Sequence, residues 1–370
     1  MRLREGWVGL AIAVQTSMSV KFLTDDTRIT GLEEVIAPNS LIEDLPLPDA
    51  ASRLIFDARR EAAAIIHGRD DRLVVIIGPC SIHDPKAAVE YAGRLAEQAE
   101  RHREDLLIVM RVYFEKPRTT VGWKGLINDP GLNNSYDINR GLHVARKLLL
   151  DVTAAGLPAG TEYLDPITPQ YIGDLVSWGA IGARTTESQI HRQLASGLSC
   201  PIGFKNSTDG SVQVAVDAVQ SAGHSHIFLS VTKAGHSAIF STAGNEDCHV
   251  ILRGGSETNY HSEAVVEAQG RLQAAGLPRG IMIDFSHGNS SKRYERQLDV
   301  SRDVAGQLAR GQRAIAGVMV ESNLVAGRQD TATTESLVYG QSITDACIGW
   351  DDSVGLLAEL AQGVQARRRA

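Results

Sequence analysis

The chain has 370 residues, of which 43% are hydrophobic and 22% are charged, proportions that are ordinary for a soluble globular protein and exclude the disordered and fibrous classes. Its formal net charge of −7 argues against nucleic-acid binding through a broad basic surface, and no stretch approaches the roughly 20 apolar residues of a membrane span. The four cysteines are widely spaced, which fits neither a disulfide framework nor a CxxC zinc site and favours a reducing cytoplasm.

The N-terminal part of the chain is expected to lie outside the main fold. Residues 1–17 contain a short, interrupted apolar run, and Met18 opens a segment that would serve as a start, so we interpret residues 1–17 as a non-native or disordered start. Residues 18–71 have mixed polarity and contain three prolines, Pro38, Pro46 and Pro48. We expect them to form an extension that contacts a neighbouring subunit and serves regulation.

From residue 72 the sequence alternates short apolar runs with longer helical periodicities, which indicates a parallel α/β architecture. The apolar runs predict eight strands, at 73–79, 106–112, 159–164, 180–184, 201–205, 249–253, 280–285 and 315–321. Helices are predicted at 85–103, 139–155, 168–178, 188–198, 211–222, 262–275 and 292–309. This order predicts a (β/α)8 TIM barrel over residues 72–365.

One interruption of the barrel is expected between its fifth and sixth strands. Two further apolar runs, 226–231 and 236–242, are joined by a short polar turn and have no helix between them. They predict a β-hairpin inserted at about 226–242.

The carboxyl ends of the predicted strands carry many polar residues, and the active site of a (β/α)8 barrel lies at these ends. Six of them are basic: Arg111, Lys116, Arg118, Arg184, Lys205 and Arg253. Arginine matches phosphate or carboxylate with a planar fork and lysine supplies a compact charge, so the set predicts phosphorylated ligands. Any one base alone could pair with a nearby acid, but six in an acidic protein favour an anion site.

A second set of strand-end residues has the composition of a metal site: Cys80, His287, Glu321 and Asp345. One thiolate, one imidazole and two carboxylates would accept Mn²⁺, Fe²⁺, Co²⁺ or Zn²⁺. Taken singly, Cys80 could be an inert buried thiol and His287 a hydrogen-bonded loop histidine, so the residue types alone leave both interpretations open.

Seven motifs together carry a resemblance to a known family. They are GPCSIHDP (78–85), RVYFEKPRTT (111–120), GARTTES (182–188), GFKN (203–206), LRGG (252–255), DFSH (284–287) and SITDAC (342–347). They resemble the class I 3-deoxy-D-arabino-heptulosonate 7-phosphate (DAHP) synthases, microbial enzymes regulated by aromatic amino acids, over about residues 24 to 365. That family condenses phosphoenolpyruvate with erythrose 4-phosphate in the first step of the shikimate pathway.

The resemblance assigns the site residues one by one. The four residues of the metal set look like ligands of a divalent metal. The implied phosphoenolpyruvate site is Arg111, Lys116, Gly182, Ala183, Arg184, Lys205 and Arg253. The implied erythrose 4-phosphate segment is Lys116, Pro117, Arg118 and Thr119. The implied catalytic residues are Lys116, Cys80, His287 and Glu162.

The implied reaction begins with attack of C3 of phosphoenolpyruvate on the aldehyde carbon of the sugar phosphate, followed by attack of water at C2 and loss of phosphate. The metal would polarise the aldehyde as a Lewis acid, and Lys116 would donate a proton to the nascent alkoxide or stabilise its charge. Glu162 is expected to be a partner of the attacking water or of a lysine.

Family members are commonly inhibited by an aromatic amino acid bound away from the active site, beside the inserted hairpin and a neighbouring subunit's N-terminal extension. The matching positions are Asp25, Asp26, Gln170, Leu194, Leu198, Ser199 and Phe228. Phenylalanine-sensitive members have serine at the position of Ser199 and tyrosine-sensitive members have glycine, which favours phenylalanine as the effector. Leu194, Leu198 and Phe228 could instead be core residues. A homodimer or homotetramer is expected.

Three alternatives compete with this interpretation. A synthase that uses arabinose 5-phosphate is disfavoured by the segment KPRTT (116–120). A Schiff-base aldolase would use Lys205 as its nucleophile, with a pKa lowered by the neighbouring bases. An inactive sensor would bind phenylalanine without turnover, although all four metal-set residues and all the basic positions are present.

Overall fold

The computed structural model describes residues 24–118, 122–278, 280–330 and 337–370, and the chain divides into two compact units, Met1–Val35 and Ile36–Ala370. The expected non-native start, residues 1–17, lies outside the described residues. In the first unit, the backbone N–H of Ile29 donates to the carbonyl oxygen of Asp26 (3.1 Å), and Asp26 has a left-handed φ of 53°. The barrel and its cavities belong to the second unit.

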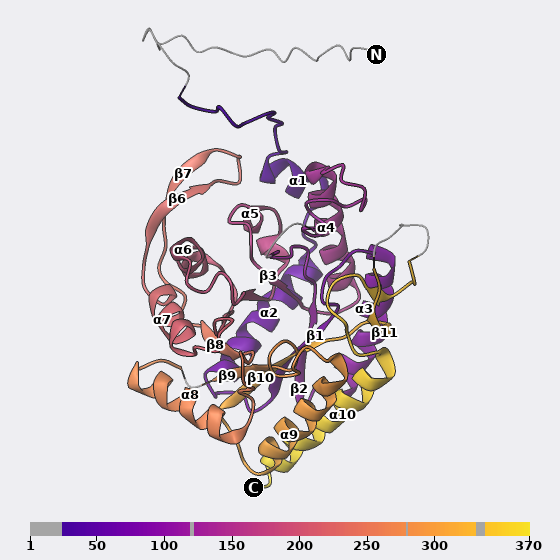
Figure 1. Ribbon diagram of the computed structural model, residues 1–370, viewed down its shortest axis with the longest axis vertical. Helices are drawn as coiled ribbons and strands as arrows, with labels where there is room; N and C mark the ends of the chain where they lie inside the picture. Colours follow the sequence, from indigo (N-terminus) through magenta and orange to yellow (C-terminus); the bar gives the residue numbers. More distant parts are fainter. Residues whose placement is uncertain (1–23, 119–121, 279, 331–336) are drawn as a thin grey trace. The chain divides into compact units, whose positions relative to one another are not determined.

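The second unit is built around a closed barrel of parallel strands (Figure 1). In the described part of the chain its eight strands are β1 (Leu73–Gly78), β2 (Leu106–Arg111), β3 (Ala159–Glu162), β4 (Trp178–Ile181), β5 (Ile202–Lys205), β8 (His249–Leu252), β9 (Ile281–Asp284) and β10 (Ile315–Glu321). Strand β1 pairs with both β2 and β10, which closes the ring. All eight strands are buried along their length, as expected when both faces of a sheet are covered. The predicted (β/α)8 barrel is confirmed.

Helix α2 (Asp49–Ile66) packs at the amino-terminal end of the barrel. Its side chains Ala62 and Ile65 share one apolar cluster with Leu107 and Ala316, which lie near the starts of β2 and β10. A Cβ atom on Gly280, just before β9, would overlap the carbonyl oxygen at the end of α2, so the close approach requires glycine there. Because α2 covers this end of the barrel, the opposite end is where the strands can open onto a cavity.

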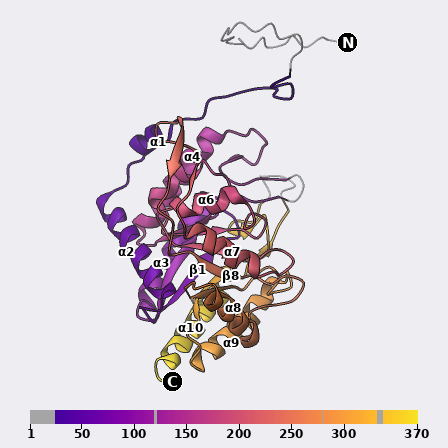
Figure 2. The ribbon, with the colours of Figure 1, turned by 90° about the vertical axis from the view of Figure 1, so that its left-hand side faces the viewer.

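The outer layer consists of helices that follow the strands (Figures 1 and 2). They are α3 (Pro85–Arg101), α4 (Ile138–Ala154), α6 (Gln189–Gly197), α7 (Gln213–Ala222), α8 (Ser262–Ala274), α9 (Gln297–Ala309) and α10 (Trp350–Arg367). The start of α3 is fixed by Asp84, whose carboxylate accepts hydrogen bonds from the backbone N–H groups of Lys86 (2.9 Å) and Ala87 (3.4 Å). Pro85 at the first helical position supports the same start. This cap holds the loop that carries Cys80 between β1 and α3.

The predicted helix at 168–178 is wrong in its second half. The structure has the short helix α5 (Pro169–Ile172), the 3₁₀ turn η1 (Gly173–Leu175), and then β4 from Trp178. Arg146 donates to the carbonyl oxygen of Tyr171 (2.8 Å), and Arg59 donates to that of Gly173 (2.7 Å). These two arginines from α4 and α2 take carbonyl oxygens that a continuing helix would have used in its own hydrogen bonds.

Several elements were not predicted from the sequence. They are α1 (Pro38–Asp44), α2, α10, and the two-stranded sheet of β11 (Val325–Arg328) and β12 (Gln341–Ser342). The predicted helix at 292–309 begins later, with the 3₁₀ turn η2 (Tyr294–Arg296) before α9, because Lys292 adopts a left-handed φ of 59°. Among the described residues, no helix is both long enough and apolar enough to cross a membrane.

The predicted hairpin is confirmed between α7 and β8. Strand β6 (Ile227–Val231) pairs antiparallel with β7 (Ser237–Ser241), and Phe228 stands opposite Phe240 with ring centroids 6.1 Å apart. At the turn, the carbonyl oxygen of Lys233 accepts a hydrogen bond from the backbone N–H of Asn39 at the start of α1 (2.8 Å). The hairpin therefore reaches from the barrel to α1, as Figure 1 shows.

Candidate active site and metal centre

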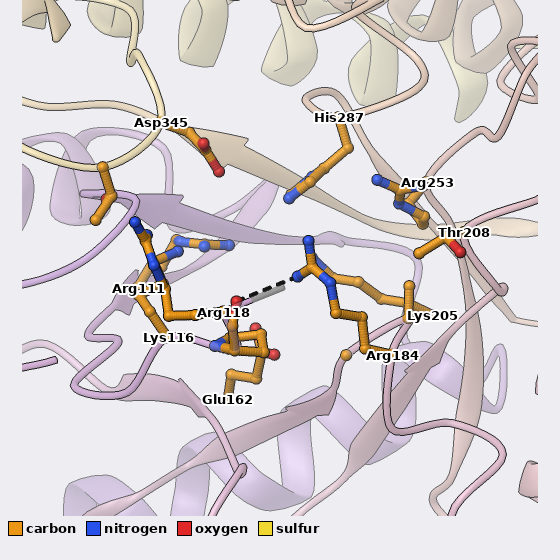
Figure 3. Close-up of a pocket in the computed structure, with 14 residues that line it drawn as sticks. Arg111, Lys116, Arg118, Glu162, Arg184, Lys205, Thr208, Arg253, His287 and Asp345 are labelled. Carbon is orange, nitrogen blue, oxygen red and sulfur yellow. Dashed lines mark hydrogen bonds between the residues drawn. The ribbon is translucent and has the colours of Figure 1, made fainter. Parts of the chain in front are cut away.

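The carboxyl ends of the barrel strands surround a cavity of about 350 Å³ (Figure 3). Its lining residues are Arg111, Lys116, Pro117, Arg118, Glu162, Gly182, Ala183, Arg184, Lys205, Thr208, Arg253, His287, Thr344 and Asp345. All six strand-end bases and every residue implied for phosphoenolpyruvate are therefore brought together. Of the segment implied for erythrose 4-phosphate, Thr119 lies outside the described residues.

Two lining residues, Thr208 and Thr344, were missed by the sequence analysis. Thr208 follows Lys205 by three positions in the loop after β5, and Thr344 stands next to Asp345. The hydroxyl of Thr344 also lies 2.6 Å from that of Ser81, so it ties the loop carrying Asp345 to the loop carrying Cys80. Proximity in sequence to a predicted site residue was the available signal in both cases.

Arg111 ends β2 and is almost fully buried, 1% exposed. Its Nη2 donates to Glu321 Oε1 (3.0 Å) and to the carbonyl oxygen of Cys80 (3.2 Å), while its Nε donates to the carbonyl oxygen of Pro79 (3.1 Å). Its guanidinium carbon stands 3.6 Å from the centre of the Tyr113 ring. These contacts fix the charge of Arg111 in one orientation at the cavity.

Glu162 ends β3 and faces the backbone that follows β4. A Cβ atom on Gly182 would overlap the Glu162 carboxylate, so glycine at this position is what lets the carboxylate and the chain approach. On the same side of the cavity, Arg184 Nη1 donates to the carbonyl oxygen of Pro117 (3.3 Å) across the opening (Figure 3). An acidic group thus lies among bases at one wall of the cavity.

Lys205 and His287 share one carboxylate. Lys205 Nζ lies 2.9 Å from Asp284 Oδ2, and His287 Nδ1 lies 2.9 Å from the same oxygen. Burial alone would raise the pKa of Asp284, but the adjacent Lys205 ammonium and His287 ring hold it well below the usual value. Asp284 is therefore ionised, although it is completely buried.

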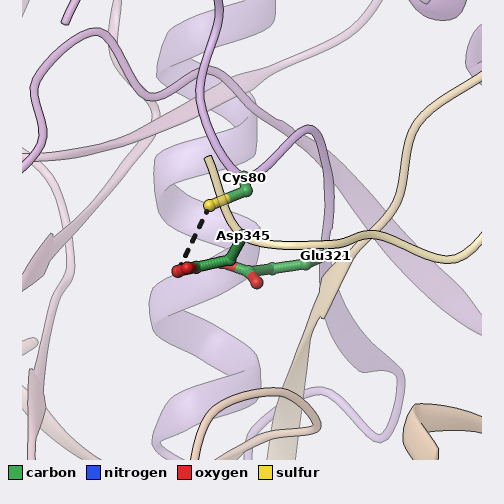
Figure 4. Close-up of side chains that lie close together, drawn as sticks. All are labelled: Cys80, Glu321 and Asp345. Atoms are coloured by element: carbon green, nitrogen blue, oxygen red, sulfur yellow. Dashed lines mark hydrogen bonds between the residues drawn. The ribbon is translucent and has the colours of Figure 1, made fainter. Parts of the chain in front are cut away.

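Three residues of the expected metal set form a compact group (Figure 4). One ligand atom from each of Cys80, Glu321 and Asp345 lies within 4.8 Å of the others. Cys80 Sγ lies 3.6 Å from Asp345 Oδ2. His287, the fourth residue of the set, is not part of this compact group, but it lines the same cavity as Asp345 and points into it (Figure 3).

The donor set fits a divalent cation. Burial, with the nearby Glu321 carboxylate, raises the pKa of the Cys80 thiol to about 11, so without a metal the thiol stays protonated at neutral pH. Cys80 and Glu321 are buried and Asp345 is exposed. A thiolate and two carboxylates this close together would repel one another, and a bound metal ion is the partner that would stabilise all three. Iron, manganese, cobalt and zinc all accept this mixture of sulfur and oxygen ligands.

Five of the seven residues expected at an effector site line a second cavity, of about 610 Å³. They are Gln170, Leu194, Leu198, Ser199 and Phe228. Phe240 also lines this cavity and was not predicted from the sequence, although its register opposite Phe228 in the predicted hairpin was an available signal. The other two expected residues, Asp25 and Asp26, belong to the first unit of the chain.

The family of this chain follows from a comparison with known proteins. A family model described as the DAHP synthetase I family matches residues 51–358. The chain belongs to this family. The resemblance found in the seven motifs is thereby confirmed.

Individual relatives extend the match to almost the whole chain. A phospho-2-dehydro-3-deoxyheptonate aldolase described as Phe-sensitive, from Escherichia coli (strain K12), is 60% identical over 94% of this chain and 100% of its own. A Trp-sensitive enzyme of the same name from Enterobacter agglomerans is 55% identical over 93% of this chain and 99% of its own. The solved structure of the enzyme of that name from Francisella tularensis SCHU S4 has a TM-score of 0.90 and 55% identity, covering 92% of this chain and 99% of that one.

Proposed function

We propose that this protein condenses phosphoenolpyruvate with erythrose 4-phosphate and water to form DAHP and phosphate, with the help of a divalent metal. The observation that carries this proposal is that the basic residues of the cavity lie beside the three metal-type donors Cys80, Glu321 and Asp345, here called the donor group. Arg111 bonds to Glu321 of the donor group, and Lys116 bonds to Cys80 (2.9 Å), while both bases line the cavity. Membership of the family and the names of its relatives support the same activity.

The bases would hold the two anionic substrates. Arg111, Lys205 and Arg253 come from three different strand ends and would surround the carboxylate and phosphate of phosphoenolpyruvate, with Arg184 beside them. Arg118 and Lys116 follow β2 and would hold the phosphate and carbonyl end of the sugar phosphate. Binding both anions in one cavity converts a bimolecular step into an effectively unimolecular one, which can supply a large part of the rate acceleration.

Cys80, Glu321 and Asp345, with His287 from the loop after β9, would hold the metal. When bound there, the ion would supply a Lewis acid to the aldehyde oxygen of the sugar phosphate. Lys116 would bring the proton to that oxygen as the C–C bond forms, because its buried ammonium stands beside the donor group. Glu162 would orient the water that attacks C2, since its carboxylate faces the backbone at Gly182 on the opposite wall.

The second cavity would bind an aromatic amino acid as a feedback inhibitor, with phenylalanine favoured over tyrosine. Phe228 and Phe240 supply an aromatic wall on the hairpin, and Ser199 supplies a small polar side chain to the same cavity. Relatives described as Phe-sensitive and Trp-sensitive support regulation of this kind. We also propose a homodimer or homotetramer that works in the cytoplasm, where the buried free thiols Cys80, Cys200, Cys248 and Cys347 would stay reduced.

A comparison of sugar phosphates tests the proposed substrate pair. Consumption of phosphoenolpyruvate should be fast with erythrose 4-phosphate and at least about tenfold slower with arabinose 5-phosphate, and the products should be DAHP and inorganic phosphate in equal amounts. Preference for arabinose 5-phosphate would overturn the proposal. Calorimetric binding of phenylalanine without any turnover would instead support an inactive sensor.

A further inference from the structure

The two carboxylate oxygens of Asp284, the last residue of β9, contact different partners. Oδ1 accepts hydrogen bonds from the backbone N–H of Ser286 (2.9 Å) and from its hydroxyl (2.7 Å). Oδ2 accepts from Lys205 Nζ (2.9 Å) and lies 2.9 Å from His287 Nδ1. The first oxygen anchors the carboxylate, and the second touches two residues that line the active-site cavity.

The anchoring is stiff because the backbone around Asp284 is held as well. The carbonyl oxygen of Asp284 accepts from Asn289 Nδ2 (2.9 Å), and the backbone N–H of Phe285 donates to the carbonyl oxygen of Met319 in β10 (2.9 Å). His287 itself has a left-handed φ of 59°, and its Nδ1 lies 2.9 Å from Asp284 Oδ2. The carboxylate can therefore set the positions of its two partners.

We propose that Asp284 is a positioning residue that aligns Lys205 for phosphoenolpyruvate and His287 for the metal through a single oxygen atom. The proposal rests on the proposed function, because it takes the binding roles of Lys205 and His287 from there. It adds that one buried carboxylate serves both binding sites at once.

The alignment of His287 follows from its tautomer. His287 Nδ1 lies 2.9 Å from Asp284 Oδ2 and 2.7 Å from the hydroxyl oxygen of Ser286, whose own hydrogen goes to Asp284 Oδ1. Both neighbours of Nδ1 are therefore acceptors, so a neutral imidazole carries its proton on Nδ1, and the lone pair of Nε2 is available to a metal ion. A carboxylate behind a metal-bound histidine commonly fixes the ring and makes it a better donor, and its loss weakens metal binding about 10- to 100-fold.

The alignment of Lys205 follows from the same oxygen. Lys205 is 3% exposed, and its ammonium needs acceptors that water cannot supply in that place. With Oδ2 on one side, the remaining N–H groups of the ammonium are left for a phosphate or carboxylate in the cavity. Asp284 would thus orient the ammonium toward the cavity before the substrate arrives.

The variant Asp284→Asn separates this proposal from a simple role in folding. The N–H of Ser286 requires an oxygen at the Oδ1 position, so the amide NH₂ must take the Oδ2 position and face two other donors, Lys205 and His287. We expect the affinity of the metal-free protein for Mn²⁺ and the affinity for phosphoenolpyruvate both to fall by about 10-fold or more. Lys205→Met should weaken binding of phosphoenolpyruvate but leave Mn²⁺ binding close to that of the unmodified protein.

The matched control is Asp247→Asn. Asp247 Oδ1 lies 2.9 Å from His67 Nε2 before the start of β8, at the opposite end of the barrel. This variant also removes a carboxylate charge beside a histidine, and it should leave the affinities for Mn²⁺ and phosphoenolpyruvate unchanged. Isothermal titration calorimetry with Mn²⁺ alone and with phosphoenolpyruvate alone measures each binding event without turnover.

The outcomes distinguish the two proposals. If the unmodified protein binds neither Mn²⁺ nor phosphoenolpyruvate, the proposed function fails. If it binds both and Asp284→Asn binds both equally well, the positioning role is overturned. Should Asp284→Asn not fold, ¹⁵N NMR of the histidine rings in the unmodified, metal-free protein decides: a proton on Nδ1 of His287 and none on Nε2 is expected, and the reverse tautomer overturns the proposal.

Discussion

The ammonium nitrogen of Lys116 lies 2.9 Å from the sulfur of Cys80. A proposed proton donor thus touches a proposed metal ligand, and Lys116 also stands 5.8 Å from the centre of the Tyr113 ring. Both Lys116 and Cys80 are buried, so the contact is shielded from water and its charge is felt strongly. The residues that would bind the metal and the residue that would move a proton form one connected group.

Replacing Lys116 by methionine removes the ammonium but keeps much of the side-chain volume. Because a positioned general acid contributes about 10²- to 10⁴-fold, kcat for DAHP formation should fall within that range. Steady-state kinetics on Lys116→Met and Lys116→Arg measure this, with circular dichroism to show that both variants fold. A kcat within threefold of the unmodified protein in Lys116→Met would rule out the assigned role.

Gly182→Ala should damage the cavity without removing any charged group. The new Cβ atom would overlap the Glu162 carboxylate, so either that carboxylate or the turn after β4 must move. We expect kcat/KM for phosphoenolpyruvate to fall at least about tenfold, since such sites depend on sub-ångström placement. Gly93→Ala in α3 is the control, because a Cβ atom there meets nothing within 4 Å, and it should leave the kinetics unchanged.

Glu115 should make stability fall as the pH rises. Burial, followed by the nearby Asp165 carboxylate, raises the pKa of Glu115 to about 8 in the folded protein, above its ordinary value of 4.5. Between these two values the folded state binds the proton and the unfolded state does not, so the stabilisation is full below about pH 4.5 and is lost as the pH rises toward 8.

The variant Glu115→Gln tests that pH dependence. It keeps a neutral, hydrogen-bonding side chain at every pH, so its Tm should exceed that of the unmodified protein by an amount that grows from pH 5 to pH 8. Thermal unfolding of both proteins across this range gives the difference directly. A difference that is constant with pH would show that Glu115 is already ionised in the folded protein.

Phe228→Ala should weaken inhibition by phenylalanine. Phe228 lines the second cavity and pairs with Phe240, so its loss removes half of the aromatic wall. Truncating a buried aromatic contact commonly costs 2 kcal/mol or more in binding, about a 30-fold higher Kd. The control is Ile227→Ala on the same strand, since that side chain is 72% exposed and does not line the cavity. Equal inhibition curves for Phe228→Ala and the unmodified protein would contradict the effector site.

The barrel could be predicted from the sequence because its strands are fully buried and therefore read as continuous apolar runs. The strand-end residues could be assigned to one cavity for the same reason, since parallel strands bring their carboxyl ends to one edge. The start of β4 at Trp178 could not be predicted, because the chain before it has helical periodicity. There the helix is ended by Arg59 and Arg146, which come from distant parts of the sequence.

Relationships between side chains were harder to predict than membership of the site. Asp284 belongs to the motif DFSH (284–287), but its contacts with Lys205 and His287 could not be predicted from that motif. They depend on β5 and β9 lying on either side of β8 in the closed barrel. Likewise, the compact group of Cys80, Glu321 and Asp345 does not include His287, whose ring is held by Asp284 and Ser286. Such distances arise from tertiary packing and have no local sequence signal.

The most direct test of the central claim is the consumption of phosphoenolpyruvate with erythrose 4-phosphate, measured with EDTA, after addition of Mn²⁺, and in the variant Cys80→Ala. The proposed metal-dependent synthase predicts that EDTA abolishes turnover, that Mn²⁺ restores it in the unmodified protein, and that Mn²⁺ does not restore it in Cys80→Ala. Turnover that resists EDTA and is lost when borohydride traps a substrate on Lys205 would contradict the claim and identify a Schiff-base aldolase.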